Sequence, residues 1–313
     1  MSTSRKIALL GGAGFLGSQL LPDLLANGHD VRVFTREDSD LSRLKEYVDD
    51  IELHLGDFAN ELAVRQAVQG CDQVVHMISS TVAANHVNSL RFDLNSNLVP
   101  TLALAESCVE LGVERITFLS SGGTVYGEPR NLPIGEDHPR RPVSEYGLGK
   151  KMIEDVLQHV SRKHDINTTI LRLSNPYGVG QRSVGLQGIV AVALGRALDG
   201  TPFTLRGDGT TTRDYQYIDD AVRGIASAMD WSDGDLTLNI SSGIGVSTNE
   251  ILELVEKTTG RELLIEKVPS SDNDVAANVL DNSLANKLLE WKPTIPLSEG
   301  FERTWQWMNR AEA

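Results

Sequence analysis

A glycine-rich turn directly after a short apolar run near the N-terminus constrains the fold more than any other feature. The run is Ile7–Leu10, and the turn reads Gly-Gly-Ala-Gly-Phe-Leu-Gly over residues 11–17. Glycine at this spacing permits a tight strand-to-helix turn, close approach of the backbone to a pyrophosphate and close packing of the next helix. We therefore expect a dinucleotide to bind here, at the N–H groups that open a helix over Phe15–Asn27. The residues predicted to contact it are Gly11, Gly14, Phe15, Leu16 and Gly17.

Short apolar runs alternate with amphipathic stretches through the first half of the chain. Strands are predicted at Val31–Phe34, Val74–Ile78, Arg115–Ser120 and Thr168–Leu173, and helices at Leu98–Leu111 and Glu145–Lys163. The runs are continuously apolar, which is typical of parallel strands buried on both faces. The pattern predicts an α/β protein with a Rossmann-type, doubly wound parallel sheet.

The alternation stops near Asn175, where glycines become frequent and the predicted strands become short. A further helix is predicted over Asn249–Thr259, capped by Thr248. We expect residues 1–174 to form a dinucleotide-binding domain and residues 175–313 a smaller substrate-binding lobe interleaved with it.

The charge balance bears on partners, because 29 basic and 43 acidic residues give a net charge of −14. Such a chain repels phosphate backbones and anionic lipid, so we expect neither a nucleic acid nor a membrane partner. No apolar run reaches the ~18 residues of a membrane span, and the N-terminus lacks the pattern of a signal peptide. Cys71 and Cys108 match no metal or redox spacing. We expect a cytoplasmic protein without a metal site.

The end of the second predicted strand bears on which dinucleotide is preferred. A carboxylate there would accept hydrogen bonds from the adenosine ribose and repel a 2′-phosphate, but the chain instead has Thr35 and Arg36. Arg36 is a candidate clamp for a 2′-phosphate, which slightly favours NADP, and it is equally interpretable as a surface charge. The choice between NAD and NADP stays open. A further strand is predicted to end at the run Gly56-Asp57-Phe58, and Asp57 and Phe58 are predicted to lie beside the adenine.

Tyr146 and Lys150 are four residues apart and therefore lie on one face of the predicted helix, which Ser144 is placed to cap. A tyrosine has an unperturbed pKa near ~10 and is a poor base at neutral pH. A nearby ammonium, together with the charge of an oxidised nicotinamide, stabilises the phenolate. Hydroxyl-rich residues that follow the preceding strand include Ser121 and Thr124, which are candidates to hold a substrate oxygen beside Tyr146.

These motifs together resemble the extended short-chain dehydrogenase/reductase family, and within it the NAD-dependent epimerase/dehydratase branch that is UDP-glucose 4-epimerase-like. The resemblance rests on Gly-x-x-Gly-x-x-Gly, on Ser-Ser-Gly-Gly-Thr-Val-Tyr-Gly and on Tyr-x-x-x-Lys. It extends to residues 171–178 and 213–220 and covers essentially the whole chain.

The resemblance implies a role for each matching residue. It makes Tyr146 the acid/base, with Lys150 lowering its pKa and holding the nicotinamide ribose. It places Asn175 and Arg213 on the diphosphate of a nucleotide sugar, and Thr124 beside the substrate. Residues implied to line the nicotinamide end of the cofactor are Met77, Ile78, Ser79 and Asn97. It also implies a homodimer, paired through a four-helix bundle made by the helices predicted at 98–111 and 145–163.

Two positions depart from the family pattern. The turn hydroxyl usual in sugar epimerases is replaced by Gly122, so proton relay must pass to Thr124, to Ser121 or directly to Tyr146. The stretch 269–274, around Ser271, lacks the arginine that often binds the diphosphate. The leading hypothesis is a nucleotide-sugar 4-epimerase, with a UDP-sugar as substrate. An NADP-dependent reductase of a 4-keto sugar or other carbonyl is the alternative, and a non-catalytic dinucleotide sensor is a third hypothesis.

Overall fold

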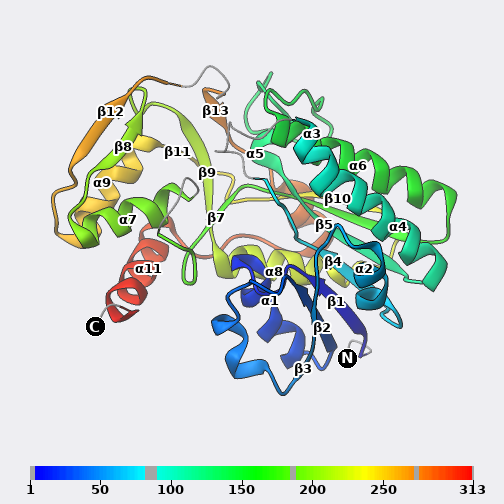
Figure 1. The fold of residues 1–313 in the computed structure, drawn as a ribbon. Coiled ribbons are helices and arrows are strands. Elements are labelled where there is room, and N and C mark those ends of the chain that lie inside the picture. The colour runs from blue at the N-terminus through cyan, green and yellow to red at the C-terminus, as the bar shows by residue number, and fades with distance from the viewer. Residues whose placement is uncertain (1–3, 82–89, 184–187, 271–274, 312–313) are drawn as a thin grey trace.

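The computed structural model describes residues 4–81, 90–183, 188–270 and 275–311. Its centre is a seven-stranded, wholly parallel sheet in the order β10-β6-β5-β4-β1-β2-β3 (Figure 1). Its strands are β1 Lys6–Leu10, β2 Asp30–Thr35, β3 Ile51–Leu55, β4 Gln73–His76, β5 Arg115–Ser121, β6 Asn167–Leu173 and β10 Leu236–Ile240. The order reverses between β1 and β4, and ligands bind at such a switch point in open α/β sheets.

Helices cover both faces of this sheet, as the sequence pattern predicts. On one face α1 packs on α8, and on the other α4 packs between α2 and α6. These helices are α1 Phe15–Ala26, α2 Glu61–Val68, α4 Val99–Leu111, α6 Glu145–Lys163 and α8 Ile218–Met229. Because both faces are covered, β1 and β4 to β6 are buried almost throughout.

The remaining elements form a second lobe beside the carboxyl ends of the strands (Figure 1). It contains a small sheet in which β9 pairs with β7, β11 and β13, and a separate β8–β12 pair. Its strands are β7 Asn175–Tyr177, β8 Phe203–Arg206, β9 Thr212–Tyr217, β11 Gly245–Ser247, β12 Ile265–Val268 and β13 Ala277–Asn278. Its helices are α7 Ile189–Asp199, α9 Thr248–Thr259 and α11 Leu297–Ala311, whereas α10 Ser283–Leu289 packs against β10 and α8 of the large sheet.

The two lobes share strands, helices and core. Both β10 and α8 come from beyond residue 174, yet they complete the parallel sheet and one of its helical layers. One apolar core runs from α1 and β1 through α8 to α7, α9 and α11. This is consistent with an interleaved arrangement, whereas the domain boundary at 174 stays a prediction.

Three predicted bounds need correction, and two short helices were not predicted from the sequence. The helix predicted from Leu98 begins earlier, as α3 Leu90–Asp93 followed by a π-helical turn, η2 Leu94–Leu98, because buried polar residues hide its apolar period. Strand β4 ends at His76, so the residues up to Ser79 follow the strand. Helix α9 is capped by Ser247, whose hydroxyl accepts from the Glu250 N–H, and not by Thr248. The turn after β5 forms a short helix, α5 Gly122–Val125, and a 3₁₀ helix, η1 Ser42–Tyr47, precedes β3.

Within the described ranges, no helix is both long and apolar enough to cross a membrane. Likewise, no cluster of three or more His, Cys, Asp or Glu side chains among the described residues is placed to hold a metal ion.

Candidate active site

The glycine-rich turn has the shape that a pyrophosphate site requires. Gly11 adopts a φ of +88°, and its carbonyl accepts from the Gly14 N–H at 2.9 Å. A Cβ at Gly17 would lie 2.6 Å from the Gly11 carbonyl oxygen and 2.6 Å from Gly12 Cα, so only glycine allows α1 to approach the turn so closely. No side chain caps the first turn of α1. Its N–H groups are therefore available to an anion.

The residues predicted beside the adenosine lie at the carboxyl ends of β2 and β3. Thr35 is buried and its hydroxyl donates to Ser39 at 2.8 Å. The Arg36 side chain is 72% exposed and forms an ion pair with Asp38 at 3.4 Å. Asp57 accepts from the Ala59 N–H, and the buried Phe58 ring packs at 4.9 Å from the His76 ring.

The segment after β4 lies directly against the glycine turn. The Cβ position of Gly11 is 3.4 Å from Ile78. Asn97 is buried on η2 and supports this segment, because its side-chain oxygen accepts from the Ser80 N–H at 2.8 Å and its amide donates to Thr81 at 3.1 Å. The structure thus brings Met77, Ile78, Ser79 and Asn97 together at the switch point, as the resemblance implies.

Helix α6 carries Tyr146 and Lys150 to the same edge of the sheet. It begins where predicted, and the Ser144 hydroxyl caps it by accepting from the Gly147 N–H at 3.1 Å. Lys150 is buried, and its Nζ donates to the Leu119 carbonyl at 3.0 Å. This ammonium lies 5.8 Å from the centre of the Tyr146 ring.

The electrostatics of this pair differ from the sequence prediction. Burial and, to a smaller extent, the Asp93 carboxylate raise the pKa of Tyr146 to about 12, although hydrogen bonds to the Ser79 and Ser121 hydroxyls act to lower it. Burial lowers the pKa of Lys150 to about 8, against the effects of Asp93 and Glu154. The protein's own side chains therefore do not acidify Tyr146, and the expected lowering by Lys150 stays a prediction for the cofactor-bound site.

Ser121 is the turn hydroxyl that reaches Tyr146. A Cβ at Gly122 would lie 2.3 Å from Leu280 Cδ1, so this packing leaves no room for the hydroxyl that epimerases usually carry at that position. The buried Thr124 hydroxyl has no hydrogen-bond partner in the described part of the chain. The relay through Thr124, through Ser121 or directly to Tyr146 stays a prediction, although Ser121 is the turn hydroxyl that affects the pKa of Tyr146.

Two of the three residues predicted to bind the substrate, Asn175 and Arg213, lie together on the small sheet, whereas Thr124 lies on α5. The Asn175 amide on β7 donates to the Asp214 carbonyl at 2.8 Å, beside Arg213 on β9. Arg213 pairs in register with Asn278 of β13, and the Asn278 amide donates to the Gly122 carbonyl at 3.1 Å. Asn278 therefore connects β9 to the turn after β5. Ser271, in the stretch that lacks an arginine, lies outside the described residues.

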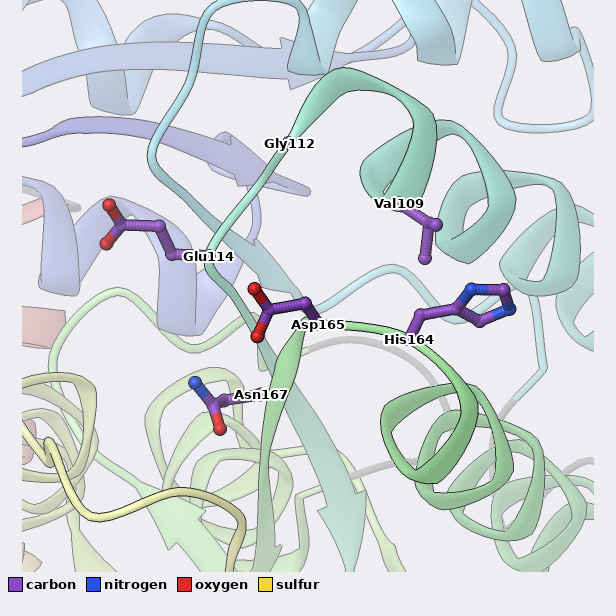
Figure 2. Close-up of a pocket in the computed structure, with 6 residues that line it drawn as sticks. All are labelled: Val109, Gly112, Glu114, His164, Asp165 and Asn167. Atoms are coloured by element: carbon purple, nitrogen blue, oxygen red, sulfur yellow. The ribbon is translucent and has the colours of Figure 1, made fainter.

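A hollow of about 570 Å³ lies at the other edge of the sheet, near the amino ends of β5 and β6 (Figure 2). Its lining residues are Val109, Gly112, Glu114, His164, Asp165 and Asn167. Since none of them carries a predicted role and the strands separate the hollow from Tyr146, we assign it no part in the chemistry.

Two contributors to the site are missed or misjudged from the sequence. The resemblance assigns Ser79 only to the cofactor, yet its hydroxyl also bonds to Tyr146. Asp93 carries no predicted role, although it faces both Tyr146 and Lys150 electrostatically. The one signal for Asp93 is its spacing, since a residue four before Asn97 shares its helix face.

A model of the NAD dependent epimerase/dehydratase family matches residues 7–241. The chain belongs to this family. The UDP-glucose 4-epimerase of Mycolicibacterium smegmatis is 31% identical, over 94% of this chain and 95% of its own. The UDP-glucose 4-epimerase of Thermotoga maritima, solved with UDP-glucose, is 29% identical, with a TM-score of 0.92 over 98% of this chain and 100% of that one. That of Thermus thermophilus, solved with NAD, is 28% identical, with a TM-score of 0.90 over 98% and 99%.

The buried ammonium of this family member carries a stability cost that can be measured. Lys150→Met is expected to remove a rise in the free energy of unfolding of the cofactor-free protein between pH 8 and 10.5, because a pKa of about 8 against an unperturbed 10.5 means that the fold disfavours the charge. The penalty is complete below pH 8 and disappears as pH rises from 8 to 10.5. Urea denaturation at several pH values measures it.

The matched control is Lys151→Met, which removes a more exposed ammonium paired with Asp155 on the same helix. It should leave the pH dependence of the free energy of unfolding as in the wild type. The same pH dependence in the wild type and in Lys150→Met would contradict the lowered pKa of Lys150.

Proposed function

We propose that the protein is a nucleotide-sugar 4-epimerase that acts on a UDP-sugar by transient oxidation at C4, with NAD as a tightly held cofactor. The observation that carries the proposal is the position of Tyr146 on α6, where the buried Lys150 ammonium lies 5.8 Å from the centre of its ring and donates to the Leu119 carbonyl of β5. The UDP-glucose 4-epimerases to which the chain is similar over nearly its whole length support the choice of substrate class.

The residues present fit a dinucleotide. The turn at Gly11, Gly14 and Gly17 leaves the uncapped N–H groups of α1 open to the pyrophosphate, and the segment 77–79 borders the nicotinamide end. A nicotinamide held there would supply the hydride acceptor, and then the hydride donor, for C4 of the sugar. The family and a structural relative solved with NAD support NAD. Arg36 is exposed and paired with Asp38, and the slight preference for NADP predicted from it stays untested.

Each side chain in the site has a distinct task in this mechanism. Tyr146 removes the proton from the sugar 4-hydroxyl as hydride leaves C4, and it returns the proton after the 4-keto sugar has turned over. Ser121 and Ser79 hold the phenol and provide a route for that proton. Lys150 supplies positive charge that favours the phenolate, and its Nζ is placed to bind the nicotinamide ribose.

Arg213 and Asn175 are proposed to hold the diphosphate. Both lie on the paired strands β7 and β9, and Asn278 ties β9 to the turn at Gly122. A charge-assisted hydrogen bond from a guanidinium contributes roughly 1.5–3 kcal/mol. The sugar would then lie between the small sheet and Tyr146.

The decisive experiment uses the protein as purified. Incubated with UDP-glucose and no added nicotinamide, it should form the 4-epimer, which NMR detects, and denaturation should release about one NAD per chain. Consumption of one NADPH per turnover of a 4-keto sugar would instead indicate the alternative reductase. Bound dinucleotide with neither activity, in a screen of UDP-, GDP- and dTDP-sugars, would contradict both enzymes and leave the sensor hypothesis.

We also propose a homodimer in which α4 and α6 of two chains form a four-helix bundle. Val99 and Leu102 on α4 are 53% and 41% exposed, an apolar area suited to a partner helix. Cytoplasmic localisation and the absence of nucleic acid partners stay predictions from composition.

A further inference from the structure

A buried carboxylate lies next to the catalytic helix without a balancing partner. Asp93 ends α3, which packs against α6, and only 3% of the residue is exposed. Its Oδ1 accepts from the Thr81 hydroxyl and from the Asn97 amide, the latter at 3.0 Å. Its Oδ2 has no hydrogen-bond partner among the described residues. Burying a carboxylate oxygen in this way is costly, so a nearby positive charge or proton is required.

The orphaned oxygen lies against α6 at Gly149. A Cβ built on Gly149 would lie 1.7 Å from Oδ2 of Asp93 and 2.8 Å from its Cγ. The carboxylate thus occupies the space that a side chain at Gly149 would fill. Since Gly149 precedes Lys150 and follows Tyr146 by three residues, the carboxylate approaches the helical turn that carries both side chains.

We propose that Asp93 is the counter-charge of the Tyr146–Lys150 pair: a positioning residue whose carboxylate sets the protonation of both groups, and with it the pH range in which the enzyme works. The proposal rests on the proposed function for its kinetic consequence only. The protonation of the pair is a property of the chain itself and is measurable without turnover.

The direction of the effect follows from charge. The Asp93 carboxylate raises the pKa of Tyr146, because it repels the phenolate, and it raises the pKa of Lys150, because it attracts the ammonium. It therefore opposes the burial that would otherwise discharge Lys150 near neutral pH. Asp93 therefore favours the charged form of Lys150, and the same carboxylate makes the phenol of Tyr146 less acidic.

The other titratable groups that face this pair come from the packed elements that the structure describes. They are Glu154, one turn beyond Lys150 on α6, and His76, at the end of β4. Glu154 forms an ion pair with Arg172 at 2.8 Å. Burial lowers the pKa of His76 to about 3, which keeps that ring neutral. Asp93 therefore differs from Glu154, because it forms no salt bridge with any arginine or lysine that the structure describes.

The test replaces the carboxylate by its neutral isostere. Asp93→Asn should lower the pKa of Tyr146 by about 1 unit or more, as removal of a carboxylate within a few ångströms does. The measurement is the pH titration of the Tyr146 ring by NMR in ¹³C-tyrosine-labelled protein. The Tyr146 signal is assigned as the one that is absent from the spectrum of Tyr146→Phe. In the active enzyme, the pH profile of kcat should move to lower pH, because the pKa values of both groups fall when the carboxylate is removed.

The control is Asp155→Asn, which removes a carboxylate of α6 that pairs with Lys151 and Arg140. It should leave the titration of Tyr146 and the pH profile unchanged. If Asp93→Asn does not fold, Asp93→Ser makes the same test with a smaller side chain. A Tyr146 titration in Asp93→Asn that matches the wild type overturns the proposal. A shifted titration in a protein without epimerase activity supports it and overturns the proposed function alone.

Discussion

Tyr146→Phe is expected to lower kcat for epimerisation by about 10²–10⁴-fold, the usual contribution of a positioned acid/base group. The substitution removes only the phenol oxygen, which bonds to the Ser79 and Ser121 hydroxyls. The ring stays, and the turn that holds the dinucleotide is formed by other residues. Cofactor content and the free energy of unfolding should therefore remain near those of the wild type, as measured by NAD released on denaturation and by urea unfolding.

Ser121→Ala provides the comparison for this variant. Because Ser79 still contacts the phenol, the loss of the Ser121 hydroxyl should cost much less activity than the loss of the phenol itself. Turnover that survives in Tyr146→Phe would show that another group removes the proton. In that case the assignment of the acid/base is wrong, although the fold and the dinucleotide site would stand.

Gly17→Ala is expected to remove the dinucleotide from the purified protein. The added Cβ would meet two backbone atoms at 2.6 Å, the Gly11 oxygen and Gly12 Cα, and backbone cannot move aside as the end of a flexible side chain can. Overpacking of this kind costs about 1–3 kcal/mol, which is about 10–100-fold in affinity if the strain is relieved by opening the turn. Titration of the cofactor-free protein with NAD measures the loss.

The matched control for this variant is Gly123→Ala. Its Cβ would have its nearest neighbour, Ser121 Oγ, at 3.9 Å, so the same substitution meets no obstacle there. Normal NAD affinity in Gly17→Ala, in a protein that unfolds like the wild type, would contradict the assignment of this turn to the pyrophosphate.

The sequence was sufficient for the elements whose local signal and tertiary role agree. The glycine turn is followed by α1, and α6 begins at Glu145 after its Ser144 cap, because each feature depends on residues a few positions apart. The parallel sheet follows from repeated apolar strands separated by helices. The candidate residues after β1, β4 and β5 meet because the carboxyl ends of parallel strands share one edge.

The sequence was insufficient where buried polar groups replace the apolar pattern. Asp93 and Asn97 lie on the inner face of α3 and η2, so this helix lacks the apolar period that locates the others. The steric role of Gly122 and Gly149 depends on Leu280 and Asp93, which approach from other elements. The pKa of Tyr146 depends on burial, which no spacing along the chain reveals.

The edge strand β10 of the parallel sheet has a consequence for engineering this protein. Because β10 and α8 return to the parallel sheet after the chain has built much of the small sheet, the C-terminal half is not a detachable module. A chimera joined near residue 174, made to import another relative's sugar preference, would also import a foreign edge strand and a foreign partner for α1. Specificity in such a chain is better altered by single exchanges around Arg213 and Asn278 than by grafting whole segments.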